Sequence, residues 1–259
     1  GLQALLAQQE IDGSWRKHLD PQTSGMTALA VYTLLQAGVS PSHPSVKRGL
    51  EFMRLNPSQK TYAVACTIMA LAEIEAYRDG DWLEAETEKL IEWQQSDGFG
   101  YPEVGVDLSN TQYAALALRS AARAGQKVPS KVWRRIGDAV QGFAEDTSGY
   151  AETSGYRYNE KYNPTGSMTA GAVMTYAICE EYAKGNTKAY AQGRERGLAW
   201  LAEHFAVDHN PHPAHPTPGK NDGQYARTLY YLYGLERIGS LLDLEKIGEH
   251  DWYREGALW

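Results

Sequence analysis

Residues 62–74 read YAVACTIMALAEI, a run whose side chains are apolar or small almost all the way round a helix. A helix without a polar face must be covered on every side. Four more stretches share this character: GMTALAVYTLLQAG (25–38), TQYAALALRSAARAG (111–125), SMTAGAVMTYAIC (167–179) and YARTLYYLYGLERIG (225–239). Together they predict a set of inner, fully covered helices.

The segments between these stretches are amphipathic. Val46, Leu50 and Met53 fall on one helical stripe, and charged residues fall on the other. This pattern recurs about every 40 to 60 residues, a period typical of stacked helical units. Outer helices with one face in water that alternate with fully covered inner helices predict two concentric rings of helices. Strand-like alternation is absent, so we expect an all-α chain.

Glycines inside the predicted outer helices indicate close packing. Gly49, Gly137 and Gly197 each cost a helix about 1 kcal/mol relative to alanine. We expect each of them to allow a neighbouring helix to approach closely.

The composition excludes several classes of partner. The 259-residue chain has a net charge of -7 and no cluster of Lys and Arg, which argues against nucleic acid as a partner. No run approaches 18 apolar residues, so we expect no transmembrane segment. Cys66 and Cys179 lie in apolar runs and are expected to be small buried side chains. No cofactor is expected.

A spaced motif carries a likeness to a known family. Gly1, Leu5, Gln9, Gly13 and Trp15 follow the spacing G-x3-L-x3-Q-x3-G-x-W, and a shortened copy has Gln95, Gly98 and Tyr101. This spacing resembles the QW repeat of squalene-hopene and oxidosqualene cyclases. In that family the Gln and Trp are structural and tie an outer helix to the following turn.

The resemblance covers nearly the whole chain. It is similar to the prenyltransferase and squalene-oxidase repeat proteins, and it implies the α/α toroid shared by triterpene cyclases and protein prenyltransferase β subunits. We expect residues 1–259 to form one toroid domain of five outer-inner pairs plus the start of a sixth. The chain opens and stops inside predicted helices, so we expect it to belong to a longer protein whose flanking regions are its partners.

The family's proton donor has no counterpart at the expected place. Cyclases carry a D-x-D-D-T-A segment at the entrance of an inner helix, and the most similar segment here is DLSNTQ (107–112). Ser109 and Asn110 stand where the acidic residues would be, and a serine hydroxyl cannot protonate an alkene. The segment also resembles an S-Q-T-A-W-A stretch of those cyclases that is not catalytic.

A metal site is not expected either. Where prenyltransferases have a zinc-binding His, this chain has Arg227, and no D-x-C opens the segment PTGSMTAGAV (164–173). His209, His212 and His215 are spaced three apart in a proline-rich stretch. In extended chain they would stand roughly 9 Å apart, too far to share one ion.

The starts of the inner helices are expected to border one mouth of a central cavity. The candidate catalytic residues are Asp107, Ser109 and Asn110. The candidate ligand-binding residues are Gln112, Tyr113, Tyr156, Tyr158, Asn163, Ser167, Tyr225, Arg227, Tyr230 and Tyr231. Two structural alternatives stay open: residues 107–112 cap a helix, and individual tyrosines pack in the core.

Three functions remain open. The first is an isoprenoid-handling enzyme related to triterpene cyclases, for which an apolar, Tyr-lined cavity with a buried carboxylate is expected. The second is a non-catalytic toroid that binds a hydrophobic ligand or a protein, with a filled centre. The third is a carbohydrate-active enzyme similar to polysaccharide lyases, which use Tyr for proton transfer and Arg or Asn to neutralise a uronate. An open groove lined by Arg, Asn and Tyr would favour the third.

Overall fold

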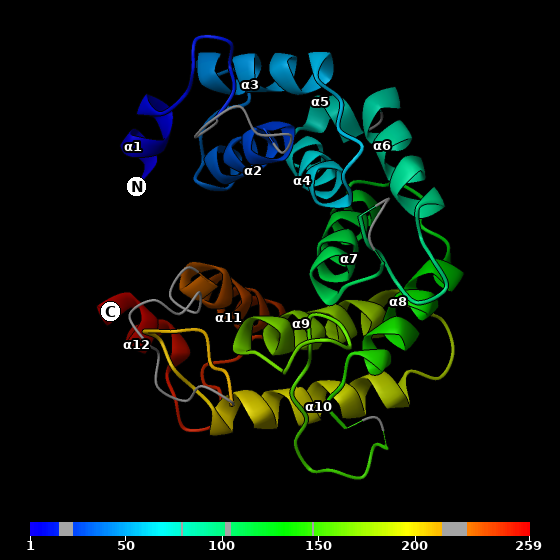
Figure 1. Cartoon of the computed structure of the whole chain (residues 1–259). Helices are drawn as coiled ribbons and strands as arrows, with labels where there is room; N and C mark the ends of the chain where they lie inside the picture. Colours follow the sequence, from blue (N-terminus) through cyan, green and yellow to red (C-terminus); the bar gives the residue numbers. More distant parts are fainter. Residues whose placement is uncertain (16–22, 79, 102–104, 147, 214–226) are drawn as a thin grey trace. The chain divides into compact units, whose positions relative to one another are not determined.

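The computed structural model describes residues 1–15, 23–78, 80–101, 105–146, 148–213 and 227–259 (Figure 1). Across these residues all regular secondary structure is helical, and pairing between extended segments is limited to isolated bridges such as Gln95 with Gly98. The chain is therefore all-α, as its sequence predicts. In the same part of the chain, no helix is long and apolar enough to cross a membrane.

The chain divides into two compact units. The first comprises residues 1–94, 99–105 and 113–129, and the second comprises residues 95–98, 106–112 and 130–259. The first unit contains α1 (Leu2–Ala7), α2 (Thr23–Gln36), α3 (Pro44–Leu55), α4 (Thr61–Ala72), α5 (Glu75–Arg78), α6 (Asp81–Glu92) and most of α7 (Leu108–Arg123). The second contains the first residues of α7, then α8 (Ser130–Gly142), α9 (Gly166–Tyr182), α10 (Lys188–Glu203), α11 (Thr228–Leu242) and α12 (Trp252–Leu258).

Helix α4 lies in the core of the first unit. All of its residues except Tyr62 are buried, and it packs against α2, α5 and α6. The ring of Tyr62 stacks on the ring of Tyr113 in α7, with 3.8 Å between the centroids. Helix α4 is thus covered on all sides, as expected for a helix that lacks a polar face.

Helix α9 takes the same place in the second unit. It is buried continuously from Gly166 to Tyr176, and it packs against α8, α10 and α11 (Figure 1). Helix α8, in contrast, buries Trp133, Ile136 and Val140 and leaves its basic residues in solvent. The two kinds of helix predicted from hydrophobic patterning are both present.

Glycines in α3, α8 and α10 lie where a side chain would collide. A Cβ atom added to Gly49 would lie 2.6 Å from Val31, one at Gly137 would lie 2.6 Å from the Tyr190 ring, and one at Gly197 would lie 2.6 Å from Val173. Since real Cβ contacts are longer than 3.0 Å, these positions require glycine. The close approach predicted for all three is confirmed.

Gln9 and Trp15 tie together the first turn of the chain. The Gln9 amide donates to the carbonyls of Gly13 (3.0 Å) and Ser45 (2.8 Å), and the Trp15 indole N–H donates to the carbonyl of Leu5 (2.7 Å). Both side chains of the QW-like motif therefore have structural roles in the first unit.

One backbone bond recurs between a turn and the helix that follows it. The Trp15 N–H donates to the Thr27 hydroxyl of α2 (3.1 Å), and the Tyr156 N–H donates to the Thr169 hydroxyl of α9 (3.0 Å). The threonine of each helix thereby fixes the aromatic residue that precedes it. This repeated bond matches the repeat seen in the sequence.

Candidate functional site

The second unit contains a pocket of about 480 Å³ lined by both polar and apolar surface. It is lined by Ser109, Tyr158, Tyr162, Asn163, Thr165, Ser167, Met168, His212, Arg227 and Tyr230. Six of the candidate residues proposed from the sequence are in this lining: Ser109, Tyr158, Asn163, Ser167, Arg227 and Tyr230.

Three helices begin at this pocket. Ser109 belongs to the first turn of α7, Ser167 to the first turn of α9, and Tyr230 to the first turn of α11. Arg227 is the N-cap residue of α11 and makes no capping hydrogen bond with its side chain. The pocket therefore faces the positive ends of three helix dipoles and one guanidinium.

Asn210 and Thr165 fix the start of α9. The Asn210 side chain accepts from the Ser167 N–H (2.7 Å) and donates to the Ser167 hydroxyl (3.1 Å), while Thr165 accepts from the Met168 N–H (3.3 Å). The carbonyl of Pro211 accepts from the Gly166 N–H (2.8 Å). These bonds hold Ser167 at the pocket and occupy the backbone N–H groups of Gly166, Ser167 and Met168, so the start of α9 offers a ligand the Ser167 hydroxyl and the remaining helix dipole.

Asn210 is a residue that sequence reasoning missed. It lies 43 positions from Ser167, and its side chain is buried. The local signal is an Asn-Pro pair in a loop, which predicts a turn but not the helix that the Asn caps.

Asp107 caps α7. Its carboxylate accepts from the backbone N–H of Asn110 (2.7 Å) and from the side-chain amide of Asn110 (2.7 Å). The Tyr158 hydroxyl also donates to this carboxylate. Burial raises the pKa of Asp107 and outweighs these hydrogen bonds, which lower it. Asp107 and Asn110 are buried and hold the helix start, as the capping interpretation expects.

Gln112 holds the Tyr230 side chain in position. Its side-chain amide donates to the Tyr230 hydroxyl, and the same hydroxyl lies 3.0 Å from the Ser109 hydroxyl. A Cβ atom on Gly171 would collide with the Gln112 side chain. Gln112 thus connects α7, α9 and α11, and its hydrogen bond sets the position of the Tyr230 hydroxyl.

Other candidate tyrosines lie apart from this pocket. Tyr113 stacks on Tyr62 in the first unit. Tyr156 is fully buried and donates from its hydroxyl to the Gly193 carbonyl (3.1 Å), and the fully buried Tyr231 packs against Gly166. Tyr225 lies outside the described residues. For Tyr113, Tyr156 and Tyr231, packing explains the position.

The spaced histidines have different surroundings. His209 pairs through Nδ1 with Asp208 (2.7 Å), His212 lines the pocket, and His215 lies outside the described residues. Where the structure does describe the chain, it contains no group of three or more His, Cys, Asp or Glu side chains arranged to hold a metal ion.

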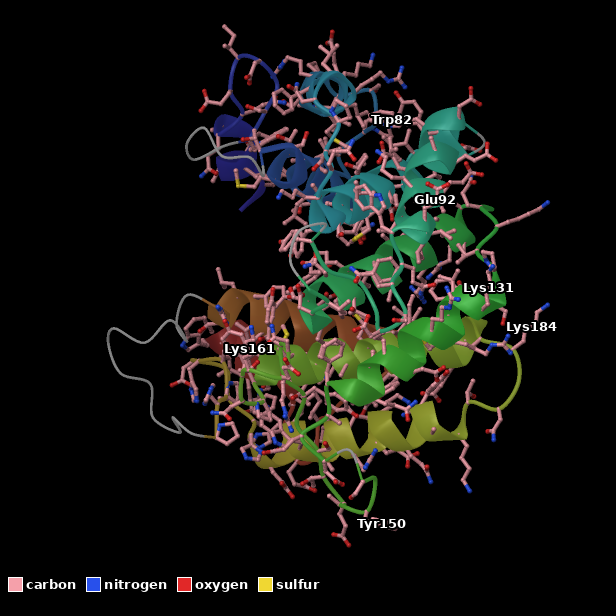
Figure 2. The ribbon with its side chains drawn as sticks, turned by 45° about the vertical axis from the view of Figure 1, so that its right-hand side comes forward. Trp82, Glu92, Lys131, Tyr150, Lys161 and Lys184 are labelled. Carbon is pink, nitrogen blue, oxygen red and sulfur yellow. The ribbon has the colours of Figure 1, made fainter. Side chains whose placement is uncertain are left out.

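The long loop before α9 carries both exposed and site residues. Tyr150 projects from it into solvent, as Figure 2 shows, and its side chain is 93% exposed. Tyr158 is anchored at the other end of the loop because its carbonyl accepts from the Leu108 N–H of α7 (2.9 Å). The loop therefore contributes to the pocket only through its last residues.

Comparison with known proteins gives no family assignment for this arrangement. No protein-family model matches the chain, and no curated protein shows significant sequence similarity to it.

Proposed function

We propose that this chain is an α/α-toroid domain of the triterpene cyclase and prenyltransferase class that binds an oxyanion-bearing small molecule in the pocket of its second unit. The observation that carries the proposal is the convergence of three helix starts and Arg227 on one pocket. Helix N-termini and a guanidinium both favour negative charge.

The size of this effect differs among the three helices. A helix start typically stabilises a nearby anion by about 0.3–1 kcal/mol, and by up to about 2 kcal/mol in partly buried sites. At α7 the carboxylate of Asp107 already occupies the helix start, whereas the groups that cap α9 are neutral. Helix α11 adds Arg227, so we place the anion at the starts of α9 and α11.

Ser109 supports the relation to the cyclase class. It stands where the resemblance aligns part of the cyclase acid motif, and its side chain lines the pocket. Half-exposed helices such as α8 and buried helices such as α4 and α9 supply the two kinds of helix that a toroid requires. A hydroxyl in place of a carboxylic acid suits binding, since it donates and accepts hydrogen bonds without releasing a proton.

Isothermal titration of the chain tests the proposal with two anionic ligands and their neutral counterparts. The pairs are geranylgeranyl diphosphate with geranylgeraniol, and an oligogalacturonide with a neutral galactose oligomer. We expect an anionic ligand to bind more tightly than its neutral counterpart. Arg227→Gln should weaken that binding about tenfold, because it removes one charge-assisted contact from an exposed guanidinium.

Lys161→Gln provides the matched control. Lys161 is an exposed cation in the loop before α9 and is not part of the pocket lining (Figure 2). It should leave affinity unchanged. Equal weakening by both variants, or equal affinity for anionic and neutral ligands, would contradict the proposal.

A carbohydrate-active function is the second candidate, and one observation favours it. Arg227, Asn163 and three tyrosines line the same pocket, the combination that a uronate-cleaving lyase would need. In such a reaction a tyrosine phenolate takes the proton from C5, the C4–O glycosidic bond breaks, a C4–C5 double bond forms, and the departing oxygen takes up a proton. Incubation with polygalacturonate and with alginate tests this function, because the unsaturated product absorbs ultraviolet light. Unchanged absorbance over hours would exclude it for those polymers.

A further inference from the structure

Another cavity of the second unit has a volume of about 160 Å³, a third of that of the pocket at the helix starts. It is lined by residues of α8, α9 and α10 and of the loop that follows α8. Its polar lining residues are Gln141, Asp146, Ser148, Tyr176, Gln192 and Arg196. The small volume suits a compact polar group rather than a large ligand.

Arg196 brings two buried hydrogen-bond donors to this cavity. Its Nε and Nη1 atoms are shielded from solvent, and no described residue accepts a hydrogen bond from either of them. The ion pair with Asp146 is long, because 3.7 Å separates Nη1 from Oδ2. Buried charged donors are costly without an acceptor, and buried polar groups in folded proteins nearly always have a partner. The guanidinium therefore lacks acceptors that a ligand can supply.

Asp146 is held beside Arg196 as an ionised acceptor. Its Oδ1 accepts from the N–H and the hydroxyl of Ser148, and its Oδ2 accepts from the Ala151 N–H (3.0 Å). These bonds lower the pKa of Asp146 to about 2. A carboxylate can accept about four hydrogen bonds, and the described residues supply three. One acceptor position, on Oδ2, remains for a ligand.

The two side chains set different requirements for that ligand. The guanidinium requires an oxyanion, because its planar fork matches two oxygens of a phosphate or a carboxylate. The carboxylate repels an anion unless the anion also donates a hydrogen bond to it. Inorganic phosphate keeps at least one O–H group at neutral pH, whereas sulfate has none. A protonated phosphate meets both requirements.

We propose that this cavity binds a protonated phosphate group, with two of its oxygens accepting from Arg196 and its P–O–H donating to Oδ2 of Asp146. Gln192 lies one helical turn before Arg196 on the same face of α10, and its exposed amide can donate to a third oxygen. The site goes beyond the proposed function, because its lining shares no residue with the larger pocket.

Isothermal titration at pH 7 with inorganic phosphate and with sulfate, at equal ionic strength, tests the proposal. Phosphate should bind about tenfold more tightly than sulfate, and Arg196→Gln should weaken phosphate binding about tenfold. Lys188→Gln is the control, since it removes an exposed cation of α10 outside the cavity lining, and it should change affinity by less than about twofold. Asp146→Asn should reduce the preference for phosphate over sulfate to within about twofold.

Methyl phosphate distinguishes a phosphate ester from free phosphate as the ligand. A phosphate monoester loses its last proton with a pKa of about 6, so methyl phosphate should bind at pH 5 and bind as weakly as sulfate at pH 8. Asp146 and Tyr176 keep their charge over this range, because the pKa of Asp146 is about 2 and burial raises that of Tyr176. If methyl phosphate binds at neither pH while inorganic phosphate binds, the ligand is free phosphate.

Two results would overturn the proposal and leave the proposed function intact. One is equal affinity for phosphate and sulfate. The other is phosphate binding that Arg227→Gln abolishes and Arg196→Gln leaves unchanged, because the phosphate would then lie in the larger pocket. Urea unfolding of the unchanged chain needs no variant. Both anions stabilise proteins non-specifically, so the midpoint should be higher in phosphate than in sulfate, and equal midpoints would also contradict the proposal.

Discussion

Gly137→Ala should destabilise the second unit, although alanine is the better helix former. Glycine inside a helix costs about 1 kcal/mol relative to alanine, so propensity alone predicts a gain. The added Cβ, however, would lie 2.6 Å from Cζ of Tyr190 and 2.8 Å from both of its Cε atoms. Normal contact requires the ring to move by almost 1 Å.

The Tyr190 ring cannot move freely because its hydroxyl is held at two points. It donates to Asp138 or to the carbonyl of Arg134, at 2.8 and 3.1 Å. Disruption of these bonds costs about 2 kcal/mol, and overpacking adds about 1–3 kcal/mol. After subtracting the gain in helix propensity, we expect Gly137→Ala to lower the free energy of unfolding by about 2–4 kcal/mol.

Urea unfolding followed by circular dichroism measures this change. Gly142→Ala is the control, since it lies in the same helix and its added Cβ would have no atom within 4 Å. It should be neutral or stabilising by up to about 1 kcal/mol. When Tyr190 is replaced by leucine, Gly137→Ala should lower the free energy of unfolding by less than it does in the unchanged chain. A Gly137→Ala protein as stable as the unchanged chain would refute the reasoning.

Three further predictions concern single side chains. Hydrogen bonds from the Ser148 hydroxyl and from backbone N–H groups lower the pKa of Asp146 to about 2. Because this pKa is below that of Asp146 in the unfolded chain, the stabilisation that the ionised carboxylate gives the fold is complete above about pH 4 and is lost toward pH 2. The unfolding midpoints of the unchanged chain and of Asp146→Asn should therefore converge over that range. Burial raises the pKa of Cys66 to about 12 and also raises that of Cys179, so neither thiol should react with Ellman's reagent at pH 8 until guanidinium unfolds the chain, and rapid labelling of the native protein would contradict this. Gln9→Ala should destabilise the first unit by about 1–2 kcal/mol in urea, because it removes two hydrogen bonds to backbone carbonyls, whereas Gln3→Ala, at an exposed position of α1, should have little effect.

The buried helices could be predicted from the sequence because their apolar composition alone indicates that they lie in the core. An all-apolar run such as the one in α4 or α9 has no face for water, so both its helical state and its place in the core follow from one pattern. The glycines of α3, α8 and α10 were predictable for a related reason. A residue that weakens a helix is expected where packing compensates for it, and Gly49, Gly137 and Gly197 each accommodate a neighbour.

The site could be predicted only in part, because neighbouring residues on a helix point in different directions. Tyr230 and Tyr231 are adjacent in sequence and about 100° apart around α11. The structure places Tyr230 in the pocket lining and buries Tyr231 against Gly166. Composition marks both as aromatic residues near a helix start, and only the contacts of α11 with α9 decide which one lines the pocket.

Long-range capping limited the prediction further. Asp107 could be identified as a helix cap because its carboxylate accepts a hydrogen bond from the N–H of a residue only three positions away. Asn210 caps α9 from 43 residues away, so no local pattern connects it to Ser167. The same holds for Gln112, whose bond to Tyr230 spans 118 positions.

These positioning contacts bear on what the pocket can bind. Ser167, Tyr158 and Tyr230 are each held by a residue outside the pocket lining: Asn210, Asp107 and Gln112 respectively. Such contacts fix the hydrogen-bonding direction of a side chain before a ligand arrives, which lowers the entropic cost of binding. They also commit specific donors and acceptors, and a site that commits its polar groups in advance discriminates against ligands that cannot match them. The same contacts also cap the starts of α7 and α9, so they stabilise the fold as well as fixing the polar groups that line the pocket.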